Sequence, residues 1–521
     1  MDHTATHRKP HHWTENHPQN WEEILSQSLT QVLINRFNQE GILYCHWKSN
    51  IDLAKTLEGE LDIDLLVSNN SFAHATNILM DLGFKPAASK WGPNPSGIFH
   101  YYGYDPNQND LVHLHMFTRV LTGESFLKSH LLPFEEMLLE NTCSSNGLTV
   151  TSKETELILF VLRMYIKYGS FLDVIRLLKS DKKVREEAHW LKEGSDMKKV
   201  GILLDKYCPV VSEDTFNACL DAILSGASYP KKWKLSRQVR QSLRIYGKYS
   251  FPGWLFGHVQ LLTGTLVKKI RKQKGGKILL SGGTIIAIVG ADATGKSTLV
   301  AETSRWLRRN FVVNTVHAGK PPATPLTVPI NLLLALYRRL RSKSRPIKIL
   351  EKDSPSSTGG IYSESKGLSS LIYATRAVCL AWDRRALLWK ARRASANGEI
   401  IVCDRYPTNA TGMMDSPRLL EDPTQKGFVA SIYNWLTRIE RNLYRQIPPP
   451  DIVLRLSVSL ETAKKRNTAR EIVDDEMYLQ NRHQQAKDWF MPGTRSIQDI
   501  DTDLPLDETL LAVKQAIWSS L

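Results

Sequence analysis

The chain has few cysteines, no long apolar run and a shortage of acidic residues. Its six cysteines lie scattered along 521 residues without a C-x-x-C pair, which argues against a disulfide framework or a structural zinc site and indicates a reducing compartment. No stretch approaches the roughly eighteen apolar residues of a membrane span, and the first residues (MDHTATHRKPHHWTENH) lack the apolar region of a signal peptide. We therefore predict a soluble, cytoplasmic protein without a transmembrane segment.

Acidic residues are outnumbered by basic ones, 53 to 68, which gives a formal net charge of +15. Such an excess favours an anionic partner, and nucleotides, nucleic acid and an anionic membrane face all satisfy it. No recognisable nucleic-acid-binding motif accompanies the basic clusters of this sequence. The length is too great for one hydrophobic core and predicts two or three domains.

Residues 284–300 (TIIAIVGADATGKSTLV) are the most informative stretch. The apolar first half predicts a strand buried on both faces of a parallel sheet. The second half satisfies the phosphate-loop pattern G-x-x-x-x-G-K-[ST], in which backbone N–H groups surround a polyanion and glycines stand where a side chain would collide. We predict that ATP is bound by the loop residues Gly290, Ala291, Asp292, Ala293, Thr294, Gly295, Lys296, Ser297 and Thr298.

Two residues of this loop carry specific chemistry. Lys296 supplies a cation to the β- and γ-phosphates, and Ser297 offers its hydroxyl to Mg²⁺. A helix is predicted over residues 299–309, and its N-terminus adds positive potential beside the phosphates. A chance glycine-rich turn would lack the buried strand before the loop and the helix after it.

The remaining C-terminal residues predict further strands and helices. The strands are expected over residues 311–317, 399–403 and 451–458, and the helices over residues 331–340, 369–397 and from 460 onward. Residues 341–367, rich in Lys, Arg, Ser, Pro and Gly, predict a flexible insertion. The strand 399–403 ends at Asp404, and an acidic residue at the carboxyl end of a buried strand beside a phosphate loop is where Mg²⁺ is usually held.

These motifs resemble those of the thymidylate kinase family of P-loop nucleoside monophosphate kinases. The resemblance rests on VGADATGKST, CDRYP and the strand PPPDIVLRLSV that leads into a basic helix, and it spans essentially all of residues 282–521. It implies a kinase that uses ATP and Mg²⁺. By position, it assigns ATP and Mg²⁺ binding to Lys296 and Ser297, Mg²⁺ ordering to Asp404, the acceptor's phosphate to Arg405, the acceptor's sugar to Asp292, and a lid to Arg466 and Arg470.

The segment after CDRYP departs from housekeeping thymidylate kinases. It is longer and polar, and it includes Asp415 and Arg418. The insertion 341–367 falls near the expected position of the acceptor base. The helix 369–397 carries charged side chains that we expect to face the same pocket: Arg376, Asp383, Arg384 and Arg385. These differences favour an acceptor other than dTMP.

Residues 41–67 form the second informative stretch. A short strand over residues 42–46 leads into the turn Lys48-Ser49-Asn50, and a second strand carries Asp62-Ile63-Asp64. Two carboxylates separated by one residue on a strand point to the same face. Such a pair can hold Mg²⁺ ions that bridge the phosphates of a nucleotide. We therefore predict that Asp62 and Asp64 are metal ligands.

This arrangement resembles the nucleotidyltransferase superfamily, in particular a group of bacterial nucleotidyltransferase-like proteins. In that family a Gly/Ser turn precedes the strand with D-x-D, and a later strand supplies a third carboxylate. Here the turn lacks the glycine, and the candidate later strand, residues 111–116 (LVHLHM), has His113 where the third Asp is expected. Histidine is a poor Mg²⁺ ligand beside carboxylates. Two interpretations remain open, an active nucleotidyltransferase and a degenerate binding domain.

The other N-terminal segments are predicted from composition and periodicity. Residues 1–20 hold five histidines among Pro, Asn and Thr, which is typical of a disordered leader more than of a metal site. Helical spacing over residues 21–39 begins the nucleotidyltransferase-like domain 21–120. Residues 121–265 are predicted as a helical subdomain and residues 266–281 as a basic linker. The alternative for residues 253–267 and the basic run after them is an amphipathic helix on anionic lipid.

We predict an α/β protein in which residues 282–521 form a P-loop domain with a parallel sheet flanked by helices. The N-terminal part is predicted as an α+β nucleotidyltransferase-like domain with a helical subdomain. The predicted function is transfer of the γ-phosphate of ATP to a nucleotide or related phosphorylated acceptor. Two rival interpretations are a binding protein whose phosphate loop acts as a nucleotide switch, and a nucleotidyltransferase with a regulatory kinase-like domain.

Overall fold

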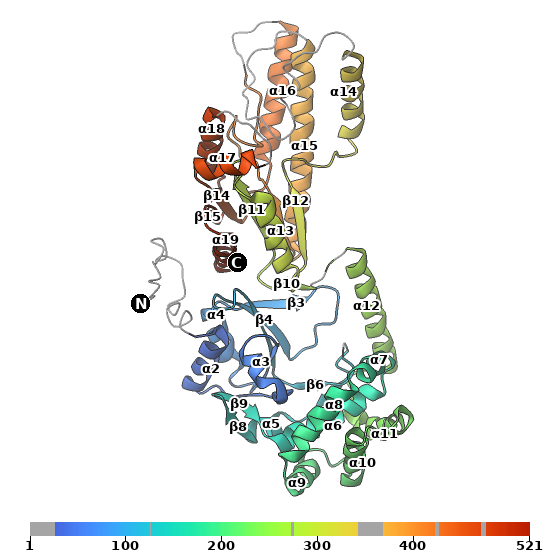
Figure 1. Ribbon diagram of the computed structural model, residues 1–521. Helices are drawn as coiled ribbons and strands as arrows, with labels where there is room; N and C mark the ends of the chain where they lie inside the picture. Colours follow the sequence, from blue (N-terminus) through green and yellow to red (C-terminus); the bar gives the residue numbers. More distant parts are fainter. Residues whose placement is uncertain are drawn as a thin grey trace, which may run out of the picture. The chain divides into compact units, whose positions relative to one another are not determined.

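The computed structural model describes residues 27–125, 127–271, 273, 276–341, 368–421, 427–469 and 476–521. The predicted leader, residues 342–367 of the predicted insertion, and Arg470 lie outside these described residues. The chain divides into two compact units after Lys272, coloured from blue to green and from yellow-green to red in Figure 1. The division falls within residues 266–281, where the sequence predicts the linker.

The N-terminal unit is built on a mixed β-sheet whose strands lie in the order β3-β4-β5-β2-β1-β9-β8. These strands are β1 (Tyr44–His46), β2 (Ile63–Val67), β3 (Lys85–Ser89), β4 (Ile98–Asp105), β5 (Asp110–Phe117), β8 (Thr142–Ser145) and β9 (Leu148–Thr151). β5 runs parallel to β2 and antiparallel to β4. Helices α2 (Leu29–Gln39) and α4 (Phe72–Asp81) pack on the sheet through a core that includes Val32, Phe37 and Ile78.

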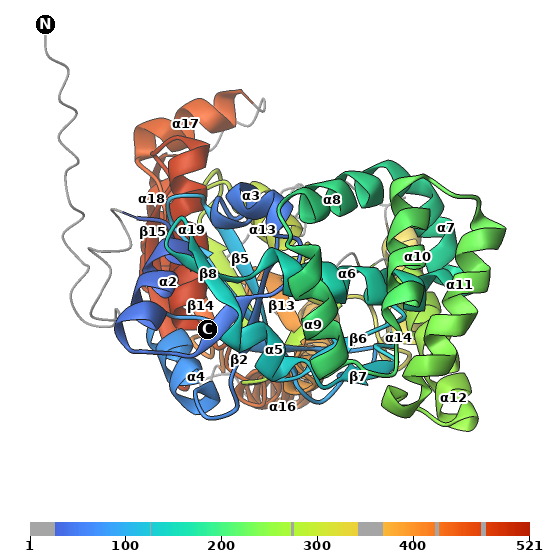
Figure 2. The same ribbon diagram turned by 90° about the horizontal axis from the view of Figure 1, so that it is seen from below.

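Helix α6 (Lys153–Tyr168) is the centre of the helical part of this unit. Its start follows from its sequence, because Ser152 caps the backbone N–H of Thr155 and Glu154 lies in the first turn. Its apolar residues surround the whole helix, as expected for a helix buried on all sides. Helices α8 to α11 contact it, as Figure 2 shows. The remaining helices are α3 (Leu53–Leu57), α5 (Glu135–Glu140), α7 (Phe171–Lys179), α8 (Asp181–Glu193), α9 (Met197–Tyr207), α10 (Glu213–Leu224), α11 (Tyr229–Ser242) and α12 (Phe251–Ile270).

The prediction that residues 121–265 are helical is wrong for their first part. Residues up to Thr151 form the strand pair β6 (Val120–Thr122) and β7 (His130–Leu132), the short helix α5, and the hairpin β8–β9. The hairpin turns at Asn146-Gly147, both with positive φ (51° and 81°), which is the geometry that this dipeptide favours. β9 then joins the sheet beside β1, so tertiary pairing stabilises a strand of only four residues.

Two predicted boundaries also shift. α2 begins at Leu29, because Ser28 provides the N-cap by accepting a hydrogen bond from Gln31 N–H. α12 extends to Ile270, into the predicted linker, since its last residues, 265–270 (TLVKKI), contain no Gly or Pro that would end the helix. At the linker's other end, β10 (Lys277–Leu279) is ordered against residues 310–312.

Within the part of the chain that the structure describes, no helix is long and apolar enough to cross a membrane.

The C-terminal unit holds a five-stranded parallel sheet in the order β12-β13-β11-β14-β15. The strands are β11 (Thr284–Gly290), β12 (Val313–His317), β13 (Ile400–Asp404), β14 (Ile452–Ser457) and β15 (Ser496–Asp501). The helices are α13 (Lys296–Leu307), α14 (Thr327–Arg341), α15 (Leu368–Ala396), α16 (Phe428–Arg445), α17 (Leu460–Thr468), α18 (Glu476–Lys487) and α19 (Leu506–Ser520). The predicted parallel α/β architecture of this unit is confirmed, and α15 and α16 run side by side beyond the sheet (Figure 1).

The strand order determines where this sheet can bind a ligand. β11 lies between β13 and β14, and its connection through α13 leads to β12 on one side of the sheet. The connection after β14 leads to β15 on the other side. Neighbouring strands whose connections diverge leave a crevice outside their carboxyl ends, where open α/β sheets bind ligands. The loop after β11 opens into this crevice.

Candidate active site

The phosphate loop follows β11, whose seven residues are all buried. A Cβ on Gly290 would come within 2.7 Å of Thr294 Oγ1 and 3.1 Å of the Leu456 carbonyl oxygen, so only glycine fits without displacement. Gly295 has a φ of +80° immediately before α13 and serves as its N-cap. The two glycines of the motif are therefore required for different reasons. Gly290 is needed because of close packing, and Gly295 because its backbone is left-handed.

Lys296 is buried inside this loop, and its ammonium group donates a hydrogen bond to the carbonyl oxygen of Ala291. Burial lowers the pKa of Lys296 to about 8, against the opposing effects of Asp292 and Asp404. A desolvated ammonium group at the N-terminal end of a helix is a strong site for an anion, since a phosphate would restore the solvation that burial removed.

Asp404 ends β13 and lies in register between Ile288 of β11 and His317 of β12. Its carboxylate is partly exposed, and His317 Nε2 lies 4.0 Å from Oδ2. Ser297, in the first turn of α13, is exposed. A hydroxyl and a carboxylate on the same edge of the sheet are the oxygen donors that Mg²⁺ prefers, so these residues fit the expected metal.

Arg405 connects the phosphate loop to a second charged group. One guanidinium nitrogen lies 3.6 Å from Asp292 Oδ1 and another lies 3.5 Å from Asp415 Oδ2. The backbone of Arg405 has a φ of +68°, a conformation that non-glycine residues rarely adopt and that the surrounding structure must hold. Its backbone N–H donates to the Ile288 carbonyl oxygen, 3.1 Å away, which holds the backbone of Arg405 beside β11.

Arg384 of α15 is a fully buried charge of the site, with 1% of its surface exposed. Its guanidinium donates to Asp415 Oδ1 at 2.7 Å, to the hydroxyl of Tyr444 at 2.6 Å and to the Ala318 carbonyl oxygen at 3.0 Å. Burial alone would raise the pKa of Asp415, but Arg384 and Arg405 outweigh it and hold that pKa below its ordinary value. Asp415 therefore stays ionised between two arginines.

A cavity of about 390 Å³ opens beside Arg384. Its lining includes Gly319, Lys320, Asn331, Tyr373, Arg376, Leu380, Asp383, Arg384, Arg418, Glu440 and Tyr444. Three of the four α15 side chains expected to face the acceptor pocket thus line this cavity. The fourth, Arg385, does not belong to the lining; its guanidinium lies over the ring of Trp382, 5.5 Å from the centroid.

Two buried carboxylates shape the walls of this cavity. Asp383 accepts hydrogen bonds from the Thr324 N–H at 2.8 Å and from the Thr327 hydroxyl at 2.7 Å, which holds the segment before α14 against α15. Glu440 of α16 accepts from the backbone N–H groups of Arg418 and Leu419. Burial raises the pKa of Glu440. The cavity thus combines aromatic, cationic and carboxyl groups.

Arg466 of α17 is one of the two lid candidates. Its guanidinium group contacts a backbone carbonyl group of the phosphate loop. It donates to the Ala293 carbonyl oxygen at 3.1 Å and to the Thr502 carbonyl oxygen at 2.7 Å. In this conformation Arg466 therefore fastens α17 to the loop. The other candidate, Arg470, lies outside the described residues.

Arg482 and His483 of α18 lie close to the phosphate loop. No sequence motif predicts this proximity. Arg482 Nε lies 3.9 Å from Asp292 Oδ2, and its side chain is 5% exposed. Burial and the nearby Lys296 lower the pKa of His483. Both residues follow the phosphate loop by more than 180 positions in the sequence, and the mostly polar sequence of α18 gives no signal of this contact.

In the N-terminal unit, the D-x-D carboxylates contact basic side chains of two other segments, the turn after β1 and the strand β5. Asp64 Oδ1 lies 3.0 Å from Lys48 Nζ and 3.1 Å from His115 Nδ1. Asp62 precedes β2, and its Oδ1 lies 3.0 Å from His113 Nδ1. The strand β5 thus brings His113 to the pair at the position where a third carboxylate was expected.

A buried side chain of the helical part, Glu156 of α6, holds the turn Lys48-Ser49-Asn50 by hydrogen bonds. Ser49 has a φ of 60°, and Asn50 donates its backbone N–H and its side-chain amide to the carboxylate of Glu156, at 3.1 and 2.8 Å. Burial raises the pKa of Glu156 to about 7, although these hydrogen bonds oppose the shift.

This raised pKa predicts a pH-dependent stability. Between the ordinary carboxyl pKa of 4.5 and about 7, the folded chain binds more protons at Glu156 than the unfolded chain. The contribution of Glu156 to the free energy of unfolding therefore falls as pH rises through this window, by up to about 1.4 kcal/mol per pH unit. In denaturation of the full chain at pH 5 and pH 7.5, Glu156→Gln should lose this dependence, and the exposed control Glu193→Gln should keep it. Equal pH dependence in both variants would contradict the assignment.

The phosphate loop and the parallel sheet make the C-terminal unit a P-loop NTPase-type domain, and comparisons with known proteins agree with nucleotide binding. No protein-family model matches the chain. The chain is 28% identical over 241 residues to the Uncharacterized ATP-binding protein YghR of Escherichia coli (strain K12), covering 45% of this chain and 86% of that protein. It is 25% identical over 244 residues to the Uncharacterized ATP-binding protein YghS of the same strain, covering 46% and 93%.

One solved structure, a thymidylate kinase from Candida albicans, matches 45% of this chain and 91% of its own, with 18% identity and a TM-score of 0.25. Each of these matches extends over less than half of the present chain.

Proposed function

We propose that the C-terminal unit binds ATP and transfers its γ-phosphate to a nucleotide or related phosphorylated acceptor in the 390 Å³ cavity. One observation carries this proposal: an unbroken series of charged contacts joins the phosphate loop to the cavity. It runs from Asp292 to Arg405, then to Asp415 and Arg384, over distances of 3.6, 3.5 and 2.7 Å. A phosphoryl donor on the loop and an acceptor in the cavity would meet at Arg405. The names of YghR and YghS, ATP-binding proteins, support the donor.

In this proposal each residue acts by position and charge, without a covalent intermediate. Lys296 binds the β- and γ-phosphates, and Ser297 and Asp404 hold Mg²⁺, which neutralises charge on the phosphates. Arg405 binds the acceptor's phosphate where transfer occurs. Arg466 positions the loop through Ala293.

The direct test incubates the full chain with γ-labelled ATP, Mg²⁺ and a panel of nucleoside monophosphates and sugar phosphates. A labelled diphosphate product is expected, and it would name the acceptor class. Release of free phosphate that is insensitive to every acceptor would instead favour the nucleotide-switch interpretation.

Nucleotidyl transfer by the N-terminal unit stays a separate prediction. If Asp62→Asn abolished the activity of the protein while Lys296→Ala left it intact, the protein would be a nucleotidyltransferase with a regulatory kinase-like unit. The opposite pattern is expected from the charged contacts of the C-terminal site.

The pKa of Lys296 predicts how ATP affinity depends on pH. Below pH 8 the ammonium form is present before binding; above it the free protein has lost that proton, and a bound polyphosphate favours its return. ATP binding should therefore take up close to one proton at pH 9.5 and almost none at pH 7, and affinity should fall by up to about tenfold per pH unit above 8. Calorimetry in two buffers of different ionisation enthalpy measures this uptake. Identical proton uptake at both pH values would rule out Lys296 as the titrating group.

A further inference from the structure

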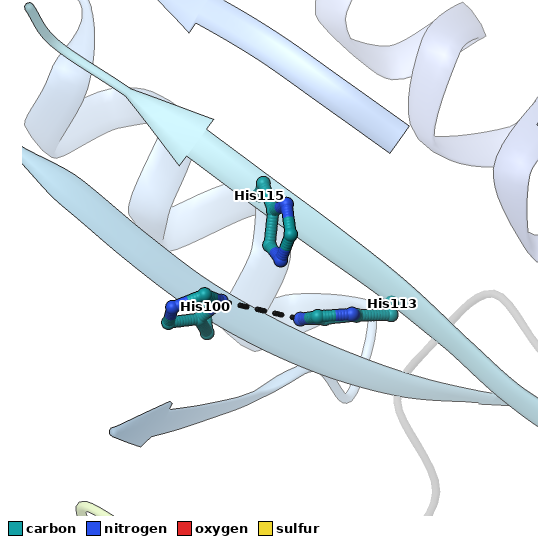
Figure 3. A group of neighbouring side chains, drawn as sticks. All are labelled: His100, His113 and His115. Atoms are coloured by element: carbon teal, nitrogen blue, oxygen red, sulfur yellow. Dashed lines mark hydrogen bonds between the residues drawn. The ribbon is translucent and has the colours of Figure 1, made fainter. Parts of the chain in front are cut away.

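Strands β4 and β5 bring three histidines together on one face of the N-terminal sheet (Figure 3). His113 and His115 are two residues apart on β5 and so share a face, and His100 of β4 lies opposite His115 in the antiparallel register. One ring nitrogen from each of the three lies within 4.8 Å of the others. His100 Nδ1 and His113 Nε2 are 3.2 Å apart and share a hydrogen bond, in which the donor depends on the tautomers of the two rings (Figure 3).

The two D-x-D carboxylates, Asp62 and Asp64, each contact a ring nitrogen of one of these histidines. Asp62 Oδ1 lies 3.0 Å from His113 Nδ1, and Asp64 Oδ1 lies 3.1 Å from His115 Nδ1. Asp64 is itself anchored by Lys48, at 3.0 Å. A carboxylate that accepts from one ring nitrogen fixes the tautomer and turns the other nitrogen outward, which is how metal-ligating histidines are usually supported.

Packing of aromatic rings accounts for only part of this arrangement. Tyr102 stacks on His113 with the centroids 4.2 Å apart and an angle of 5° between the planes, and this contact would stabilise the ring without a metal. Stacking does not require a carboxylate on His113 Nδ1, a second one on His115 Nδ1, or the approach of His100 Nδ1 to His113 Nε2. A cation that took the place of the shared proton would bind the lone pairs of both nitrogens, with the carboxylates supporting the opposite side of the rings.

We propose that His100, His113 and His115 bind a divalent transition-metal ion of the zinc class. Imidazole suits Zn²⁺, Co²⁺ or Ni²⁺, whereas Mg²⁺ prefers oxygen. Two nitrogens at ~2.05 Å from a tetrahedral ion stand ~3.3 Å apart, close to the separation of His100 and His113. In this site Asp62 and Asp64 orient the imidazoles. His113 stands where the third carboxylate was expected, and in this proposal its presence reflects a change of metal from Mg²⁺ to an ion of the zinc class.

Metal titration of the full chain tests the proposal, with one precaution. The leader carries His3, His7, His11, His12 and His17, which can bind metal by themselves, so all five are first replaced by Ala. The protein is stripped with a chelator and titrated with Co²⁺, following metal content and the visible absorption of nitrogen-ligated cobalt. We expect a site of one Co²⁺ per chain, displaced by Zn²⁺.

Variants assign this site to its residues. His100→Ala and His113→Ala should each weaken Co²⁺ binding by about 100-fold or more and remove the visible bands, and Asp64→Asn should weaken it by about 10- to 100-fold. The matched control is His74→Ala on α4, a half-exposed histidine that pairs with Glu40 outside the cluster. The His74→Ala variant should bind Co²⁺ with the same affinity as the parent protein. Unchanged binding in His113→Ala, or no visible bands in the parent, would overturn the proposal.

A second measurement needs no substitution in the cluster and so does not depend on the folding of the variants. Diethyl pyrocarbonate modifies accessible imidazoles, and mass spectrometry locates the products. Zn²⁺ should protect His100, His113 and His115 while His74 reacts at the same rate with and without metal. Equal modification of the three histidines in both conditions would equally overturn the proposal.

Discussion

Lys296→Ala is expected to lower phosphoryl transfer by at least about 100- to 1,000-fold and to weaken ATP binding in the same variant. The physical reason is the position of the ammonium group, which is buried within the loop against the Ala291 carbonyl oxygen. Removal of one preorganised charge at the site where charge develops typically costs that factor. The measurement compares kcat and KM for ATP with those of Lys390→Ala, an exposed lysine of α15. This matched control should leave both constants unchanged.

An effect of Lys296→Ala on KM alone would change the interpretation of the role of Lys296. A variant that raised KM but kept kcat would show that Lys296 binds ATP equally in the ground and transition states. Turnover and KM that are both unchanged in Lys296→Ala would contradict the proposed function, because no neutral side chain can replace a desolvated cation at the γ-phosphate.

Asp415→Asn is expected to destabilise the C-terminal unit by about 3–5 kcal/mol. The substitution removes the carboxylate that lies 2.7 Å from one nitrogen of Arg384, which is 1% exposed, and leaves that guanidinium without its charged partner. Loss of one partner from a buried pair costs more than the pair contributed, since the remaining charge stays desolvated. Urea denaturation, followed by circular dichroism, measures the change in the free energy of unfolding.

The control for this prediction is another Asp–Arg pair of the same unit. Asp499 accepts two hydrogen bonds from Arg455, at 2.8 and 2.7 Å, but it is 67% exposed. Because water solvates both partners after the loss, Asp499→Asn should cost at most about 1 kcal/mol. Equal destabilisation by the two substitutions would show that burial does not decide the strength of the Arg384–Asp415 pair.

Local patterns predicted the chemistry that depends on neighbouring residues. The phosphate loop with Lys296, the end of β13 at Asp404 and the length of α15 followed from an apolar strand, a turn motif and helical periodicity. The hairpin at Asn146-Gly147 was missed although its dipeptide is a known turn signal, because strands of four residues carry too little periodicity to outweigh the helical pattern after them. The role of Arg466 could not follow from sequence either, since its hydrogen bonds go to backbone carbonyls.

The sequence by itself determined that this protein carries a nucleotide-type phosphate loop on a buried parallel strand, because loop, strand and helix are contiguous and each has a local physical signature. Only the tertiary structure decided which charges meet. Strand order brings Asp404 beside the loop, α15 places Arg384 against Asp415, and the register of β4 with β5 sets His100 beside His113 and His115. These contacts join residues far apart in the chain, and their energies depend on burial and on distances of a few ångströms, which no local pattern encodes.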